Sequence, residues 1–325
     1  MRLLLFGELG PGTLARSLEL GLAAEATVVA TNPYRSQSGR SELPRTAAAR
    51  LGRRLNHRSR VMQAGRALVE TAEQLRPDAA LVVKGRGVDA GSITHVRRLG
   101  VPVAVYYPDN PAWAFSDTQG VKERLVASTL AIVWSERLAA QLAAGGANAR
   151  VLPFGYDTRW WGPASPGGDR HGIVFLGQWS PRRERYLAAL AGLPLTVRGG
   201  GWDHTGVPAG PPVFGPSAGA LLAGAEIGVN VLHLANAGAH NMRTREIPAT
   251  GALQLTNPGT DGTPLRDRTS CAWFESPAEL RTLAENYLSH RDEAAAIAGE
   301  GQQLTRDDTY VERGRTLARW LAELV

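Results

Sequence analysis

Short apolar runs, each followed by a glycine turn or a helical segment, set the pattern of the first half of the chain. Apolar positions at helical spacing predict one helix that ends near Ala23 and another from Val61 to Leu75, before the stop at Arg76-Pro77. Strands that alternate with helices are typical of a doubly wound α/β domain on a parallel sheet. The predicted strands of this half are Arg2 to Phe6, Thr27 to Ala30, Ala79 to Val83, Val103 to Tyr107, Leu130 to Trp134 and Arg150 to Leu152.

A stretch rich in proline, glycine and tryptophan, from Phe154 to Asp169, separates this half from the next. We expect Trp160 and Trp161 within it to pack between domains, with stacking on a sugar as the alternative. The 325 residues then form two domains, 1–160 and 170–325. Three helices end the second domain, and its predicted strands are Gly172 to Leu176, Leu195 to Arg198, Glu226 to Val231 and Ala252 to Leu255.

The first glycine turn, Gly7-Glu8-Leu9-Gly10-Pro11-Gly12, does not have the G-x-G-x-x-G spacing of dinucleotide sites. The second strand ends at Thr31-Asn32-Pro33, without the acidic residue that would hold a ribose. A nicotinamide-dependent dehydrogenase is therefore not expected.

Two glycine turns of the second domain are candidate nucleotide contacts. After the first strand and its glycine, Ser180 and Pro181 begin a helix whose N-terminus suits an anion. The turn from Gly199 to Trp202 lets the backbone approach a base or a ribose closely. The candidate residues at these turns are Gly177, Arg182, Arg183, Gly200 and Trp202.

The stretch from Asn241 to Thr256 combines a polar entrance, one short helical turn and a buried strand. A polar helix start beside a strand end is a place where open sheets bind ligands. The Glu246 carboxylate can accept both hydroxyls of a ribose, and the guanidinium groups of Arg243 and Arg245 can meet phosphates. The candidate contacts of this stretch are Asn241, Arg243, Thr244 and Glu246.

The same stretch, Asn-Met-Arg-Thr-Arg-Glu-Ile-Pro-Ala-Thr-Gly-Ala-Leu-Gln-Leu-Thr, resembles the signature of the CgeB-like, spore-maturation-type glycosyltransferases. That signature runs roughly N-x-R-T-F-E-I-P-A-C-G-A-F-x-L-T, and further family motifs match from Tyr287 to Arg313. The resemblance implies a bacterial enzyme of GT-B architecture: two doubly wound, Rossmann-like α/β domains that face a cleft. It implies a nucleotide-sugar in the second domain, with Arg182 or Arg183 at its diphosphate, an acceptor in the first, and a last helix that crosses back. The chain departs from the pattern at Arg245, where an aromatic residue is usual, and at Asp308, where the family has histidine.

An inverting transfer needs a general base, and the first domain offers two candidates at the ends of strands. Asp109 follows the strand that ends at Tyr107, and Glu8 lies in the first glycine turn. Asp109 is equally suited to ordering a proline-rich turn. Many retaining GT-B enzymes carry a second glutamate eight positions before the one matched by Glu246, and Gly238 stands there, so the stereochemical outcome stays open.

The sequence contains no D-x-D motif, and His233 and His240 lack further ligands at metal spacing. We therefore expect a metal-independent hexosyltransferase that needs no cofactor beyond its nucleoside-diphosphate sugar donor. Its acceptor is expected to bear a hydroxyl, on a small molecule, a glycan or a protein. Two alternatives remain: a GT-B-fold sugar-nucleotide epimerase, and a non-catalytic nucleotide-sugar-binding or coat assembly protein.

The net charge of +6 comes almost entirely from arginine, most densely between Arg35 and Arg60. We interpret that segment as a solvated face, with contact to an anionic acceptor or surface as the alternative, and expect no nucleic-acid partner. No apolar run is long enough to span a membrane, the start is too short for a signal peptide, and a cytoplasmic location is expected. The oligomeric state cannot be inferred from the sequence.

The segment from Gly215 to Gly219 matches the G-x-S-x-G elbow of serine hydrolases. That motif needs a strong strand before it, and only Val213-Phe214 precedes this one. We expect Ser217 to cap a short helix that extends to Ala223, and no hydrolase activity.

Overall fold

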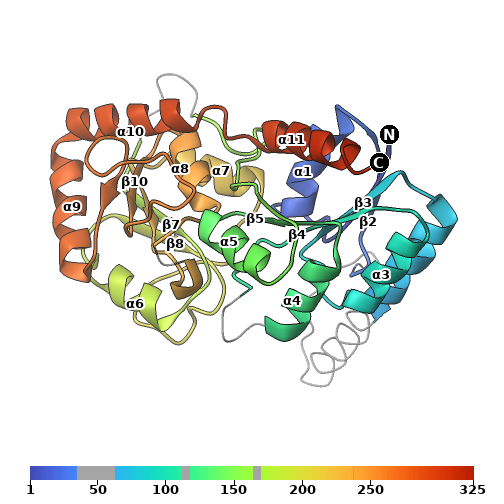
Figure 1. The fold of residues 1–325 in the computed structure, drawn as a ribbon. Coiled ribbons are helices and arrows are strands. Elements are labelled where there is room, and N and C mark those ends of the chain that lie inside the picture. The colour runs from blue at the N-terminus through green and yellow to red at the C-terminus, as the bar shows by residue number, and fades with distance from the viewer. Residues whose placement is uncertain (35–62, 112–117, 164–169, 237) are drawn as a thin grey trace. The chain divides into compact units, whose positions relative to one another are not determined.

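The computed structural model describes residues 1–34, 63–111, 118–163, 170–236 and 238–325. These residues form two compact units (Figure 1). Unit 1 contains Met1–Leu152 and Arg313–Val325, and unit 2 contains Pro153–Glu312. The basic segment from Arg35 to Arg60 lies outside the described residues.

Unit 1 is built on a six-stranded parallel sheet in the order β2-β1-β3-β4-β5-β6. Helices cover the sheet, so its inner strands are continuous apolar runs rather than alternating ones. The helices are α1 (Leu14–Ala23), residues 63–75, α3 (Ala90–Arg98), α4 (Thr118–Ala127), α5 (Glu136–Ala144) and most of α11 (Tyr310–Ala322). The strands are β1 (Arg2–Phe6), β2 (Thr27–Thr31), β3 (Ala79–Val83), β4 (Val103–Tyr106), β5 (Leu130–Val133) and β6 (Ala149–Val151).

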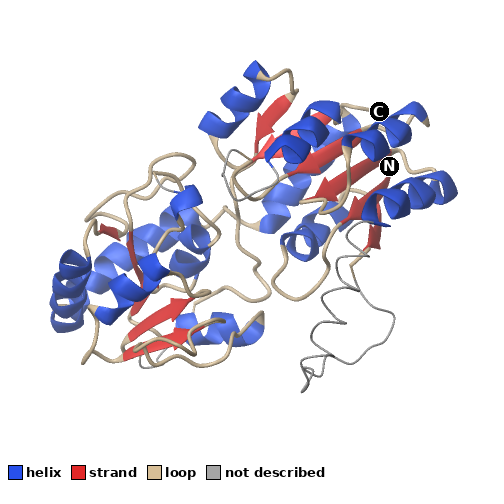
Figure 2. Cartoon of the chain, turned by 90° about the horizontal axis from the view of Figure 1, so that it is seen from below, coloured by secondary structure: helices blue, strands red, loops and turns tan. Residues whose placement is uncertain are grey.

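Unit 2 is built on a five-stranded parallel sheet in the order β11-β10-β9-β7-β8. Alternate residues of β7 enter two different apolar clusters, Ile173 and Phe175 one and Val174 and Leu176 the other, as expected of a strand covered on both faces. In Figure 2 the helices lie around the strands of each sheet. The strands are β7 (Ile173–Leu176), β8 (Leu195–Arg198), β9 (Ile227–Asn230), β10 (Leu253–Thr256) and β11 (Ala272–Trp273). The helices are α6 (Pro181–Ala188), α7 (Pro216–Ala223), α8 (Arg243–Ala249), α9 (Pro277–Ser289) and α10 (Arg291–Thr305).

Each sheet has a point at which the strand order reverses direction. In unit 1 it lies between β1 and β3, because β2 is added on one side of β1 and β3 on the other. In unit 2 it lies between β7 and β9 for the same reason. Ligands of open α/β sheets bind outside the carboxyl ends of the strands at such points, so these two edges are where a site is expected.

The last helix packs within unit 1. Arg315 on α11 faces Glu25 at 3.6 Å, and Glu323 just after it meets Arg150 at 2.6 Å. Gly314 lies against the backbone of Gly21 in α1, where any larger side chain would collide. Among the described helices, none is long and apolar enough to cross a membrane.

Trp161 is buried in an apolar cluster of unit 2, and Trp160 packs against the same cluster. Packing of this pair between domains stays a prediction. One expectation about local structure was wrong. Ser217 does not cap α7, because Gly215 holds the N-cap position with a φ of 56° and Ser217 is an exposed residue inside the helix. Gly219 allows the Trp160 carbonyl to approach α7, and Gly215 provides the positive φ at the N-cap, so local structure accounts for both glycines of this G-x-S-x-G segment.

Candidate functional site

Two arginines meet at the switch point of unit 2. The Arg183 Nε donates to the carbonyl of Val231, one residue past β9, at 3.2 Å. The Arg243 Nε donates to the carbonyl of Leu176, the last residue of β7, at 3.4 Å. Their guanidinium groups therefore lie at the two strand ends that flank the switch point, where the sequence predicted a polyanion contact.

The environment of these arginines is unfavourable for cations in the absence of an anion. Burial lowers the pKa of Arg183, and the positive charge of Arg243 lowers it further. Like charges brought together in a partly buried place make this a candidate site for an anion. Both guanidinium groups also cover aromatic rings, Arg183 over Phe175 at 5.6 Å and Arg243 over Trp161 at 5.0 Å. These rings leave the guanidinium edges to donate hydrogen bonds.

Arg182 is the neighbour of Arg183 in the first turn of α6. Its Nε is buried without a hydrogen-bond partner among the described residues, and its guanidinium lies 5.1 Å from the Tyr186 ring centre. Arg182 also borders a hollow of about 180 Å³ that includes Asn257 and Glu275. The buried, unsatisfied donor beside an open space adds a third cation to the predicted anion site.

Glu246 occupies the first turn of α8 and forms an ion pair with Arg243, three residues before it. The residue is 3% exposed, and burial raises the pKa of its carboxyl, against the opposing effect of Arg243. Asp157 adds negative charge nearby and raises that pKa further. A carboxylate so enclosed is well ordered, and a ribose contact from Glu246 stays a prediction.

Asp157 and Arg159 were not singled out from the sequence. The Asp157 carboxylate is 2% exposed, and it accepts from Nε and Nη2 of Arg159 at 2.9 and 2.5 Å. Both residues lie in the proline- and glycine-rich stretch that the sequence treats as a linker. The sequence signal for this pair is an aspartate followed two residues later by an arginine in a turn. Such pairs are common, so the signal does not single out a site.

Asn241 and Thr244 form the entrance to α8. The side-chain amides of Asn241 and Asn230 exchange two hydrogen bonds, of 3.1 and 3.0 Å. The Asn241 Oδ1 accepts from the backbone N–H of Thr244, and the Thr244 hydroxyl accepts from that of Asn241. Their polar groups thus anchor α8 to the end of β9, while a ligand contact from either residue stays a prediction.

The glycine turns after β7 and β8 lock together. The carbonyl of Gly177 accepts the indole N–H of Trp202 at 3.0 Å, and a side chain at Gly199 would collide with that carbonyl. Trp202 is 4% exposed and packs on Phe175, so its indole has no face open for stacking on a base. Gly200 has no atom near its Cα on the side a Cβ would take, and its carbonyl accepts from the Trp179 backbone N–H at 2.9 Å. Backbone contacts from Gly177, Gly200 and Trp202 stay predictions.

Arg245 points away from the other arginines of this edge. It is 1% exposed, and its Nε donates to Asp308 Oδ2 at 3.1 Å while Nη2 donates to the carbonyl of Gly262. The two residues at which the chain departs from the family pattern are therefore one ion pair. Arg245 is structural here, which leaves Arg182, Arg183 and Arg243 for a ligand.

At the switch point of unit 1, three charged residues follow three neighbouring strands. Glu8 follows β1, Lys84 follows β3 and Asp109 follows β4 by three residues. The Lys84 Nζ lies 2.6 Å from Asp109 Oδ2, and both side chains are partly exposed. Glu8 is exposed and forms no ion pair among the described residues. The structure thus brings the two predicted base candidates to one edge and adds a lysine that the sequence did not single out.

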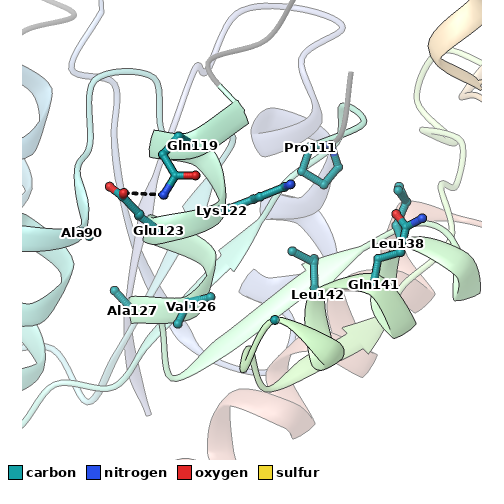
Figure 3. A pocket seen from close by; sticks show the side chains of 11 residues that line it. Ala90, Pro111, Gln119, Lys122, Glu123, Val126, Ala127, Leu138, Gln141 and Leu142 are labelled. Atoms are coloured by element: carbon teal, nitrogen blue, oxygen red, sulfur yellow. Dashed lines mark hydrogen bonds between the residues drawn. The ribbon is translucent and has the colours of Figure 1, made fainter. Parts of the chain in front are cut away.

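A larger hollow, of about 740 Å³, is lined mainly by residues of α4 and α5 (Figure 3). Its lining includes Val126, Leu138 and Leu142, and Lys122 extends across it toward Pro111 while Gln119 bonds Glu123. None of the residues predicted from the sequence lines this hollow. The paired charges lie at the switch point instead, so size alone does not locate the chemistry. Among the described residues, no three His, Cys, Asp or Glu gather as a metal site.

Residues 182–319 match the family model described as Glycosyl transferase-like. No curated protein sequence matches the chain. Among solved structures, HepE from Anabaena in complex with UDP-glucose superposes with a TM-score of 0.71 at 12% identity, over 100% of both chains. Sucrose-phosphate synthase from Thermosynechococcus elongatus reaches 0.69 at 12% identity, over 99% of this chain and 98% of that one. A UDP-GlcNAc 2-epimerase from Neisseria meningitidis bound to UDP-GlcNAc reaches a TM-score of 0.57 at 10% identity, over 99% of this chain and 100% of that one.

The predicted GT-B fold, with two Rossmann-like parallel α/β domains, is confirmed.

Proposed function

We propose that the protein is a glycosyltransferase that moves a sugar from a nucleoside-diphosphate sugar to an acceptor hydroxyl. The observation that carries the proposal is the gathering of Arg182, Arg183 and Arg243 at the switch point of unit 2. A diphosphate supplies the negative charge that this place lacks, in the position where open sheets bind nucleotides.

The comparisons support the same assignment. The region that matches the glycosyl transferase-like model contains all three arginines and Glu246. HepE was solved with UDP-glucose and the epimerase with UDP-GlcNAc, so a uridine nucleotide is the first donor to test. The stretch around Glu246 further supports a CgeB-like member of the class.

In the proposed transfer, the main role of unit 2 is to bind the donor diphosphate and stabilise its negative charge. As the bond between the anomeric carbon and the diphosphate oxygen breaks, the leaving group gains negative charge, which fixed guanidinium groups stabilise. We propose that this replaces a metal ion and that no further cofactor is needed. In unit 1, Asp109 or Glu8 would take the proton of the acceptor hydroxyl. We also propose a hexosyl donor and a cytoplasmic location.

Thermal unfolding with UDP, GDP, dTDP and CDP tests the donor site. A nucleotide that binds only the folded protein, at 100 times its dissociation constant, adds about 2.7 kcal/mol of stability. We expect one of the four to stabilise the wild type and to lose that effect in Arg243→Ala. Arg185→Ala, on the exposed side of α6, is the matched control and should retain the shift. If none of the four raises the melting temperature, the proposal fails.

Turnover separates this proposal from its two alternatives. The structural likeness to UDP-GlcNAc 2-epimerase favours an epimerase as the second candidate. An epimerase converts the donor with no acceptor present, so a changed sugar nucleotide in a donor-only incubation would favour it. A non-catalytic binding protein would show the thermal shift without any turnover, and Asp109→Asn with Glu8→Gln would leave it unaffected.

A further inference from the structure

We propose that Lys84 is a positioning residue for Asp109, and that Asp109 rather than Glu8 is the general base of unit 1. The inference rests on the proposed glycosyl transfer. It begins from the ion pair between Lys84 Nζ and Asp109 Oδ2, 2.6 Å apart, at the switch point of unit 1. Glu8 lies at the same edge, but no described cation holds its carboxylate in one orientation.

The backbone of Lys84 is in a conformation that lysine rarely takes. Its φ is 62°, in the left-handed region, and Gly85 follows with a φ of 60°. Left-handed backbone is unfavourable for a residue with a Cβ, and glycine would adopt it without that cost. Strained residues of this kind cluster at functional sites, where the surrounding structure holds them in place. The described side-chain contact of Lys84 is with Asp109, and in this proposal that contact is what favours lysine over glycine here.

Arg124 of α4 contacts the two segments that carry the ion pair. Its guanidinium is buried, and Nη1 donates to the carbonyls of Gly85 at 2.6 Å and Val88 at 3.2 Å. The same group lies 5.4 Å from the ring centre of Tyr107, two residues before Asp109. One side chain thus fixes the turn that carries Lys84 and the segment that carries Asp109.

Tyr34 adds a further tether to the same turn. Its hydroxyl donates to the carbonyl of Arg86 at 2.7 Å, and burial raises the pKa of this phenol to about 12, so it stays a donor. The turn after β3 is consequently held from the segment after β2 and from α4. An ion pair built on such a turn keeps the carboxylate oriented before any acceptor arrives, which is the requirement for efficient proton transfer.

In the reaction, one Asp109 oxygen faces Lys84 and the other accepts the proton of the acceptor hydroxyl. The hydroxyl oxygen forms its bond to the anomeric carbon as the bond from that carbon to the diphosphate oxygen breaks. The diphosphate leaves with the electron pair, and the proton remains on Asp109 until it is released to water. Lys84 does not exchange a proton in this step.

The test uses variants in which the melting temperature should be maintained or rise while the transfer activity falls. Lys84→Gly removes the ammonium and relieves the left-handed backbone, so its melting temperature should be no lower than that of the wild type. Its kcat for transfer should fall 10- to 100-fold, with KM for the acceptor and nucleotide affinity changed less than threefold. Added ethylammonium should restore part of the rate in Lys84→Gly and none in Asp109→Asn. Lys84→Arg should retain more activity than Lys84→Met.

Arg76→Gly is the matched control, because Arg76 also has a positive φ, of 43°, but lies at the opposite end of β3. It should fold at least as well as the wild type and keep full activity. Unchanged kcat in both Lys84→Gly and Lys84→Met would overturn the inference, as would loss of transfer in Glu8→Gln but not in Asp109→Asn. If the wild type shows neither nucleotide binding nor turnover, the proposed function itself has failed. If Lys84→Gly unfolds, the comparison of Lys84→Arg with Lys84→Met decides.

Discussion

The carboxyl edges of the two sheets are alike in topology and opposite in electrostatics. At the edge of unit 1, the cation of Lys84 is matched by Asp109, and both side chains are partly exposed. At the edge of unit 2, among the described residues, Arg243 pairs with the buried Glu246, while no ion pair is formed by Arg182 or Arg183. The ion pair at the first edge is charge-balanced, with the Glu8 carboxylate beside it, and the second edge carries unmatched positive charge.

This difference shows how one fold supplies two kinds of site. A balanced, exposed pair has no net attraction for a polyanion but can orient a neutral hydroxyl and take its proton. A partly buried group of arginines is suited to a diphosphate and to the charge that grows on it. Because parallel sheets place loops from several strands at one edge, the loop residues rather than the fold decide which site is made.

The largest effect is expected from the ion pair of Arg245 with Asp308, which is separate from the three candidate ligand-binding arginines. Asp308→Ala removes a carboxylate that is paired with the buried Arg245 cation and should cost about 3–5 kcal/mol of stability. Chemical denaturation measures this loss. The double variant Arg245→Phe with Asp308→His should recover most of it, since the two substitutions remove the charge pair together. If the stability losses of the two single variants simply add up in the double variant, the pairing is contradicted.

A smaller effect is expected on ligand affinity. Arg183→Met should weaken nucleoside diphosphate binding by about 1.5–3 kcal/mol, the contribution of a charge-assisted hydrogen bond. Isothermal titration calorimetry provides the affinity. Lys84→Met, at the balanced edge of unit 1, is the contrasting variant and should leave nucleotide affinity unchanged. Equal losses of nucleotide affinity in Arg183→Met and Lys84→Met would contradict the proposed difference between the two edges.

In unit 2, substitution of Gly219 should reduce stability, whereas substitution of Ser217 should not. A methyl group at Gly219 would overlap the Trp160 carbonyl, so Gly219→Ala should cost about 1–3 kcal/mol. Ser217→Ala alters an exposed side chain two residues away and should stay within about 0.5 kcal/mol of the wild type. Thermal unfolding of the two variants compares them. A stable Gly219→Ala would mean that the Trp160 segment does not pack against α7.

The smallest effect concerns the pH dependence of stability. Burial raises the pKa of Glu246 above its unfolded value, so the group favours the folded state when it is protonated. That contribution is complete below the unfolded pKa of about 4.3 and is lost as pH rises through the folded one. Glu246→Gln cannot ionise, so its stability relative to the wild type should increase from pH 4 to pH 8. Denaturation at several pH values measures this trend, and Glu300→Gln, at an exposed site on α10, should show none.

The strands could be predicted well because a buried parallel strand is a continuous apolar run, and glycine or proline ends it. Helices α4 and α5 were not predicted, and neither was the two-residue β11, which is too short to carry a pattern. The ion pair of Arg243 with Glu246 was within reach of the sequence, because residues three apart share one face of a helix. The sequence reading instead gave the two residues separate ligand contacts.

Other parts of the site depend on contacts between distant segments, which one sequence does not reveal. Arg245 and Asp308 are 63 positions apart, and the sequence analysis noted both as departures from a family pattern and Arg245 as a possible phosphate contact, without pairing them. Arg124 reaches the turn at Gly85 from 39 positions away, and the backbone strain at Lys84 is visible only in coordinates. Trp202 was assigned to a ligand because it ends a glycine turn, whereas its indole packs inward on Phe175.

The contact of Gly21 with Gly314 has a consequence for synthesis on the ribosome. Unit 1 is interrupted in the chain by the whole of unit 2, and α11 cannot reach α1 until Glu312 has been translated. Domains that emerge from the ribosome fold in order. The surface of α1 at Gly21 therefore stays uncovered by α11 while unit 2 is synthesised. The close glycine contact therefore makes the completion of unit 1 a later event than the synthesis of unit 2.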